Sequence, residues 1–285
     1  LNDTNPTLYA DTLFSALYQE AMKQQKENSF YQMVHTGKLI FSDGFPYQGR
    51  EYYLPKPYIR IEGTDKKGNS KEKKKFKKLK YIPLSTLERY LKGETKAEEF
   101  EEEQELGYTG MKVSVAVRGK EEPEPYRVRY FTFQEGNGLY FLVKTDNEEG
   151  IQLLDELMTG LSYSGIGGKR HTGMGRFEYE RCDMPAILRT KLETSAEKYM
   201  LLSTALPEEN ELEQILEQAE YQLLKRSGFV ASTDYADQQM RKRDLYVFQS
   251  GSCFRKTFSG QIVDVSDAGR HPVYRYAMGI FMGVG

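Results

Sequence analysis

The chain has 285 residues, of which 39% are hydrophobic and 13% aromatic, enough apolar material for one large or two modest cores. Its 40 Lys and Arg are nearly balanced by 42 Asp and Glu, and the formal net charge is −2. This balance excludes a global basic field, so any contact with nucleic acid has to come from local patches.

Cysteine usage and hydropathy exclude several further classes. Cys182 and Cys253 lie far apart and form no CxxC motif, so neither a disulfide framework nor a cysteine-based zinc site is indicated. No apolar run approaches the ~18 residues of a membrane span, and no signal peptide is visible. We therefore expect a cytoplasmic protein without a metal or other cofactor.

The first predicted element is a helix over residues 7–26, where Leu13, Leu17 and Ala21 recur at helical spacing. A leading helix is unusual for a ferredoxin-like βαββαβ unit, in which the first helix should connect two strands. The chain also begins without Met. We therefore expect the first strand of such a unit to lie upstream of Leu1.

The next segment is irregular and then strongly charged. Residues 38–60 are rich in Tyr, Phe, Gly and Pro, which predicts a loop with short edge strands. Residues 66–80 hold nine Lys and one Glu, and residues 94–105 hold seven Glu and one Lys, with a short helix predicted over 84–91 between them. The two runs are either solvated insertions that pair loosely with each other, or the Lys run lies along an RNA backbone.

Strand patterns resume at 111–117, where Met111, Val113 and Val115 alternate with polar or small residues. Residues 126–133 and 139–144 flank Glu135-Gly136-Asn137-Gly138 and predict a hairpin. A helix follows over 151–161, with Asp146 and Glu149 at capping-box spacing. This order is that of a βαββαβ unit without its first strand.

A second pattern begins after Pro185, and we place a domain boundary at 188/189. Residues 199–203 predict a buried strand, and Pro207 predicts the start of a long amphipathic helix that ends before Gly228. Three more strands are predicted at 229–231, 245–249 and 252–258. The fold class is therefore α+β, with a ferredoxin-like (RRM-like) domain over 1–188 and an abbreviated one over 189–285.

The most distinctive stretch is a glycine-rich loop between the helix at 151–161 and an alternating run from Phe177. Glycine lets a backbone approach a ligand closely. The cations between the glycines indicate that this ligand is anionic. The spacing fits neither a Walker loop nor a dinucleotide fingerprint. We interpret the loop as a cradle for RNA phosphates, formed by Gly165, Gly167, Gly168, Lys169, Arg170, His171, Thr172, Gly173, Gly175 and Arg176. Phe177, Tyr179 and the Tyr-rich segment 45–58 are either platforms for unstacked bases or core residues.

This loop resembles the C-terminal glycine-rich loop of the RAMP superfamily of CRISPR–Cas proteins, whose domains are ferredoxin-like RNA binders. Two further stretches, Phe41-Ser42-Asp43-Gly44-Phe45-Pro46-Tyr47 and His271-Pro272-Val273-Tyr274-Arg275-Tyr276, resemble the Csm-type subunit that caps the 5′ end of the guide RNA in type III-A interference complexes.

The resemblance implies a non-catalytic subunit that holds the 5′ tag of the CRISPR RNA and joins the large polymerase-and-nuclease subunit to the backbone subunits. It adds Ser42 and Asp43 to the predicted RNA-binding residues. A processing endoribonuclease stays open as an alternative, because related superfamily members use a His near the position of His35. We expect His171 to donate to phosphate and His271 to be structural. An RNA-free scaffold is the third possibility.

Overall fold

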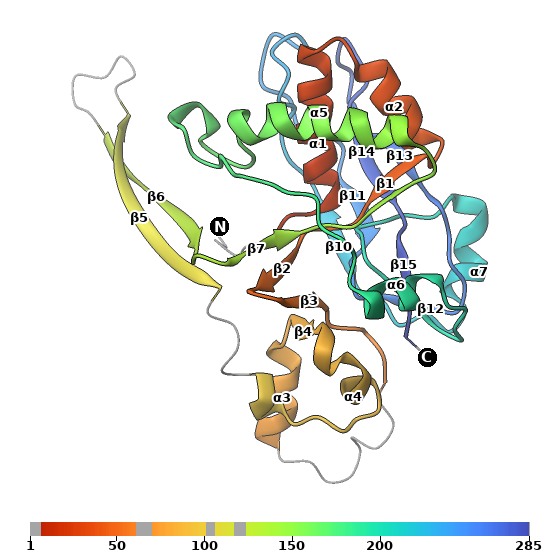
Figure 1. The fold of residues 1–285 in the computed structure, drawn as a ribbon. Coiled ribbons are helices and arrows are strands. Elements are labelled where there is room, and N and C mark those ends of the chain that lie inside the picture. Colours follow the sequence, from red (N-terminus) through yellow and green to blue (C-terminus); the bar gives the residue numbers. More distant parts are fainter. Residues whose placement is uncertain (1–6, 61–69, 101–105, 117–123, 285) are drawn as a thin grey trace. The chain divides into compact units, whose positions relative to one another are not determined.

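The computed structural model describes residues 7–60, 70–100, 106–116 and 124–284. It is a mixed α+β structure with small antiparallel sheets, drawn in Figure 1. The chain forms two compact units. One comprises Gly44–Leu54 and the described part of Ile61–Tyr140, and the other comprises Leu8–Asp43, Pro55–Arg60 and the described part of Phe141–Gly285. The predicted boundary at 188/189 falls inside the second unit and stays a prediction.

The second unit is built around three helices: α1 (Ala10–Lys23), α2 (Glu27–His35) and α5 (Glu148–Ser164). Leu13, Leu17 and Ala21 of α1 are buried as their spacing predicts, but the predicted helix over 7–26 ends at Lys23 because Gln25 has a φ of 57°. The helices α1 and α5 are in contact (Figure 1). A Cβ atom at Gly160 would lie 3.1 Å from Glu20 Oε2, so glycine permits this close crossing.

Strands from both ends of the chain flank these helices. β1 (Leu39–Phe41) pairs with β8 (Val143–Thr145), and β13 (Gly260–Asp264) pairs with β14 (Tyr274–Met278), both antiparallel. Tyr276 of β14 joins the two pairs: its ring stacks on Phe41 at 4.6 Å, its hydroxyl donates to Phe41 O at 2.7 Å and accepts from Phe41 N at 2.9 Å. Tyr276 is fully buried. A side chain thereby satisfies two backbone groups at the edge of β1, which otherwise would stay unpaired in the core.

The second unit also contains a sheet in the order β12-β9-β15, formed by β12 (Cys253–Phe254), β9 (Tyr199–Leu201) and β15 (Phe281–Gly283). Its core contains Leu201, Phe248, Phe254 and Phe258. The other elements are the helices α6 (Ala186–Glu193) and α7 (Leu212–Leu216) and the strand pair β10 (Leu223–Arg226) and β11 (Leu245–Phe248). The apolar segment at the end of the described chain forms two strands, β14 and β15, which are separated by Gly279 and Ile280.

The structure corrects the predicted long helix after Pro207. Only a 3-10 turn at Glu209–Glu211 and α7 form, because Gln218 has a φ of 56° and the chain then enters β10, which pairs with β11. Strand pairing overrides the helical spacing of Leu223 and Leu224. The predicted strand at 229–231 is reduced to a single bridge between Phe229 and Arg241.

The predicted hairpin around Gly136 is also wrong in its pairing. β6 (Glu124–Phe133) pairs with β5 (Gly107–Ala116), whereas β7 (Asn137–Tyr140) pairs with β2 (Phe45–Gln48), so the turn at 134–137 connects two different sheets. β7 and β2 belong to a sheet in the order β4-β3-β2-β7, with β3 (Glu51–Pro55) and β4 (Tyr81–Pro83). These strands lie mostly in the first unit.

Where the structure describes them, the charged runs contain short helical elements. Part of the Lys run forms the helix α3 (Ser70–Lys78), and the helix predicted over 84–91 is a 3-10 turn at Leu84–Thr86 followed by α4 (Leu87–Leu91). Phe76 of α3 packs against Tyr90 and Phe100, with ring centroids 6.3 and 6.2 Å apart. Residues 61–69 and 101–105 lie outside the described residues. An aromatic cluster therefore anchors the Lys-rich helix.

Candidate nucleic-acid interface

The glycine-rich loop begins where α5 ends. Asn147 caps the start of α5 by accepting a hydrogen bond from Gly150 N at 2.8 Å, in place of the predicted capping box of Asp146 and Glu149. Gly165, with a φ of 78°, ends the helix and its N–H donates to Leu161 O at 2.7 Å. A helix of seventeen residues thus carries the loop on a fixed end.

Two glycines close the base of the loop. Ile166 N donates to Gly175 O at 2.9 Å. A Cβ atom at Gly175 would lie 2.1 Å from Ile166 O, and one at Gly165 would lie 2.8 Å from Met174 O. Both distances are shorter than van der Waals contact, and both residues have a positive φ that favours glycine. Gly165 and Gly175 are therefore required by the shape of the loop.

The tip of the loop is open. Lys169 has a φ of 59°, the residues Arg170–Thr172 form a 3-10 turn, and the Thr172 hydroxyl donates to Lys169 O at 2.7 Å. Gly167 and Gly173 have a positive φ, with nothing within 4 Å of an added Cβ. Gly168 has neither a positive φ nor a crowded Cβ position, so no local structural reason accounts for glycine there.

Hydrogen-bond donors and positive charge converge on this tip. The N–H groups of Gly167 and Gly168 are exposed and make no hydrogen bond within the described part of the chain. Arg170 is partly buried and donates to Gln19 Oε1 of α1 at 3.0 Å, which orients its guanidinium beside the loop. His171, Thr172 and Arg176 are exposed. Successive free amides beside cations form a site suited to an anion.

The predicted strand from Phe177 does not form, because residues 176–185 run back along α5 without pairing to another strand. Tyr179 is fixed there by its hydroxyl, which lies 2.8 Å from Thr159 Oγ1 and donates to Asp155 O at 2.9 Å. Sequence reasoning missed Tyr163, which is 74% exposed in the last turn of α5. Tyr163 does not belong to the apolar face of the predicted helix, and this could have indicated from the sequence that its ring is exposed. Tyr163 is the most exposed aromatic residue near the loop and can stack with an unpaired base.

Ser42 and Asp43 lie elsewhere and are buried, with 0% and 2% of their surface exposed. Ser42 Oγ donates to Asp43 O at 2.7 Å and accepts from Leu142 N at 2.9 Å. Asp43 Oδ1 accepts from Ala10 N at 2.8 Å and Thr204 N at 3.0 Å, joining the start of α1 to the segment after β9. Both side chains therefore serve internal hydrogen bonding, and their direct contact with RNA stays a prediction.

Burial makes the Asp43 carboxyl sensitive to pH, because it raises the pKa from 3.8 to about 6 despite the opposing backbone hydrogen bonds. The folded state then binds more protons than the unfolded state between these values, so stability falls as pH rises through this window. Between about pH 4.5 and about pH 7 the wild type should lose ~2 kcal/mol relative to Asp43→Asn. Urea unfolding of both proteins across this range measures the difference, and parallel curves would contradict the predicted role of Asp43.

The three histidines occupy different settings. His35 ends α2, is exposed, and stacks on Tyr31 with centroids 5.4 Å apart. No hydrogen bond to its ring occurs among the described residues. His271 is held by Ser232 Oγ at 2.9 Å and by Pro272 O at 2.8 Å, in agreement with a structural role. A general acid–base pair needs a second group within reach of the first, and the described surroundings of His35 do not supply one.

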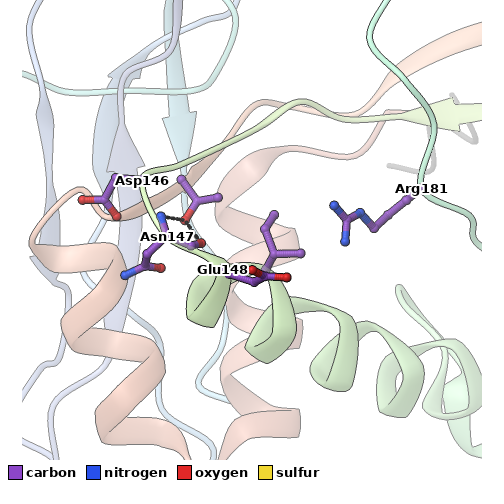
Figure 2. Close-up of a pocket in the computed structure, with 6 residues that line it drawn as sticks. Asp146, Asn147, Glu148 and Arg181 are labelled. Carbon is purple, nitrogen blue, oxygen red and sulfur yellow. Dashed lines mark hydrogen bonds between the residues drawn. The ribbon is translucent and has the colours of Figure 1, made fainter.

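A surface pocket at the opposite end of α5 has a different character. It has a volume of about 380 Å³ and is lined by Thr145, Asp146, Asn147, Glu148, Ile151 and Arg181. Figure 2 shows the carboxylates of Asp146 and Glu148 at the helix start, with Arg181 on the returning chain. Arg181 pairs with Asp155 at 3.4 Å. Acidic side chains dominate this pocket, so it is poorly suited to a phosphate group.

Within the described ranges, no cluster of three or more His, Cys, Asp or Glu could hold a metal ion. Among the helices described, none is both long and apolar enough to cross a bilayer.

Comparison with known proteins identifies the class. A family model for the CRISPR-associated protein Cas_Cmr3 matches residues 10–238, and a model for the CRISPR Csm4 C-terminal domain matches residues 194–284. The chain is thus a CRISPR-associated protein. A Csm4 protein of Mycobacterium tuberculosis H37Rv is 39% identical over 277 residues, covering 96% of this chain and 89% of the relative. One of Streptococcus thermophilus is 36% identical over 289 residues, covering 99% and 92%. The chain belongs to the Csm4 family.

Solved structures show the same fold. A chain in the Csm3–Csm4 subcomplex of a type III-A CRISPR–Cas interference complex has a TM-score of 0.66 at 17% identity, covering 97% of this chain and 93% of that chain. A chain in the Csm1–Csm4 cassette bound to cA4 has a TM-score of 0.63 at 22% identity, covering 98% and 92%.

Proposed function

We propose that this chain is a non-catalytic, RNA-binding subunit of a type III-A CRISPR interference complex. The observation that carries this proposal is the tip of the glycine-rich loop, where free backbone N–H groups lie beside Lys169 and Arg170 on a loop whose base is fixed. Family membership supports the same function, because the relatives are named as Csm4 proteins of a CRISPR system.

The partner proteins follow from the relatives. The Csm3–Csm4 and Csm1–Csm4 structures support a role in which this chain links the backbone subunit to the large subunit. We propose that the chain acts in the cytoplasm as part of such a complex. We propose in addition that the helices and strands of the chain represent two ferredoxin-like domains divided at 188/189. The match of the C-terminal family model from residue 194 supports that boundary.

The proposed ligand is the 5′ tag of the guide RNA. Backbone amides at Gly167 and Gly168 face the sugar-phosphate chain, together with Lys169, Arg170, His171, Thr172 and Arg176. Gly165, Gly173 and Gly175 give the loop its shape. Tyr163 supplies a surface on which a base stacks. Contacts to phosphate position the RNA, and contacts to base edges and 2′-hydroxyls distinguish the tag from other sequences.

Replacing both Lys169 and Arg170 by Ala tests the cationic part of this site. If each side chain neutralises one phosphate, the slope of log affinity for tag RNA against log salt should become shallower by about 1.4. The matched control is Lys38→Ala with Arg189→Ala, which removes two exposed cations elsewhere. Equal slopes for the two double variants would favour a scaffold that does not bind RNA through this loop.

Absence of catalysis is tested separately. Repeat RNA incubated with the full chain in EDTA should stay intact, because the described surroundings of His35 supply no acid–base partner. Gel analysis of the RNA measures this. Cleavage that disappears in His35→Ala would establish the nuclease alternative.

A further inference from the structure

The Lys-rich helix α3 is anchored through Phe76 and Lys75. Phe76 packs into the cluster with Tyr90 and Phe100, and Lys75 pairs with Glu98 at 3.5 Å. Arg89 pairs with Glu99 at 3.0 Å. Part of the acidic run is therefore paired with cations, one on α3 and one on α4.

The outer side of α3 is different. Lys74, Lys77 and Lys78 make no hydrogen bond or ion pair with any described residue, and all three are exposed. At ~100° per residue, Lys74 and Lys78 project away from Phe76, and Lys77 lies beside them. The Cβ atom of Lys74 is roughly 5–6 Å from those of Lys77 and Lys78, which follow it by three and four residues. The helix thus presents three adjacent ammonium groups on a face directed away from its anchor.

This arrangement costs stability without a ligand. Like charges three and four residues apart on a helix repel each other. An anionic polymer with closely and evenly spaced charges would offset the repulsion. A phosphate backbone has that spacing, and Lys acts on it as a point charge without selecting a base.

We propose that the face formed by Lys74, Lys77 and Lys78 binds the phosphate backbone of single-stranded RNA independently of sequence. This site goes beyond recognition of the tag, because it involves neither the glycine-rich loop nor any base contact. It adds a second region of contact in which affinity comes from counterion release.

The test uses the full chain and a uridine oligonucleotide that lacks the tag sequence. The triple variant Lys74→Gln, Lys77→Gln, Lys78→Gln should lower the slope of log affinity against log salt by about 2, since each contact with a single strand contributes ~0.7. Between 50 and 200 mM salt, wild-type affinity should therefore fall roughly 20-fold more than that of the variant. The thermal midpoint of the variant should be equal or higher, because the repulsion is gone.

The control is Lys38→Gln, Lys92→Gln, Lys144→Gln, which removes the same charge from scattered exposed positions. Its slope should stay close to that of the wild type. Equal losses in both triple variants would show only a general charge effect and overturn the proposal. Displacement of the RNA by polyglutamate of matched charge as readily as by unlabelled RNA would also overturn it, in favour of an acidic protein partner.

Discussion

Asp11→Ala should destabilise the protein by ~3–5 kcal/mol, because it leaves the buried guanidinium of Arg275 and the partly buried one of Arg226 without their shared carboxylate. Arg226 forms a fork with Asp11 through Nη2–Oδ1 at 2.7 Å and Nε–Oδ2 at 2.8 Å, and Arg275 Nη1 donates to Oδ2 at 2.6 Å. The Asp11 and Arg275 side chains are 4% and 7% exposed. Few surface substitutions have an effect of this size.

Asp11 connects three elements of the second unit, and one of them, α1, also contacts the glycine-rich loop. Asp11 lies in the first turn of α1, Arg226 ends β10 and Arg275 lies on β14, so one carboxylate joins the start of α1 to two distant strands. Gln19 on the same helix holds Arg170 of the loop. Urea unfolding measures the loss. The control, Asp244→Ala, breaks the exposed 2.7 Å pair with Lys225 and should scarcely change stability. A similar effect from the two variants would contradict this explanation.

Gly175→Ala should lower affinity for tag RNA by about tenfold or more, corresponding to at least ~1.4 kcal/mol. The added methyl group would overlap Ile166 O, and Ala is strained at a φ of 78°. The base of the loop must then open, which displaces the tip that carries the free amides. Fluorescence anisotropy with labelled tag RNA measures the loss.

Gly168→Ala separates loop shape from ligand approach. Nothing in the described structure hinders a methyl group at Gly168, so thermal stability should change by less than ~0.5 kcal/mol. Affinity for RNA should nevertheless fall, because the methyl group projects where the backbone meets the phosphate. Unchanged affinity in Gly168→Ala, alongside weak binding by Gly175→Ala, would mean that the ligand does not approach this glycine.

Local patterns predicted the elements that bury one regular face. The spacing of Leu154, Leu157 and Leu161 predicts α5, and all three are buried. The alternation of Met111 and Val113 predicts β5, which forms. These two side chains are nevertheless 54% and 60% exposed. Alternation of apolar and polar residues indicates a strand, but it does not indicate whether the apolar face of that strand is covered.

Predictions failed where distant contacts decide the structure. The residue spacing after Pro207 indicates a long helix. In the structure Leu223 and Leu224 instead pair with β11, a contact that the local sequence does not reveal. Asp43 resembles a loop carboxylate in sequence, and only the approach of Ala10 and Thr204 makes it internal. The sequence predicts which residues form the loop. It does not predict which glycines are needed for the shape of the loop and which lie at its open tip, because this depends on the position of Ile166 O.

The central claim is that the tip of the glycine-rich loop holds the 5′ tag of the guide RNA. The most direct measurement is to affinity-purify the chain from cells with its native complex and to sequence the 5′ ends of the RNA that accompanies it. We expect a short RNA with one uniform 5′ sequence, and a marked reduction of that RNA when Lys169, Arg170 and Arg176 are replaced together by Ala. RNA with heterogeneous 5′ ends, or undiminished uniform RNA with the triple variant, would contradict the claim.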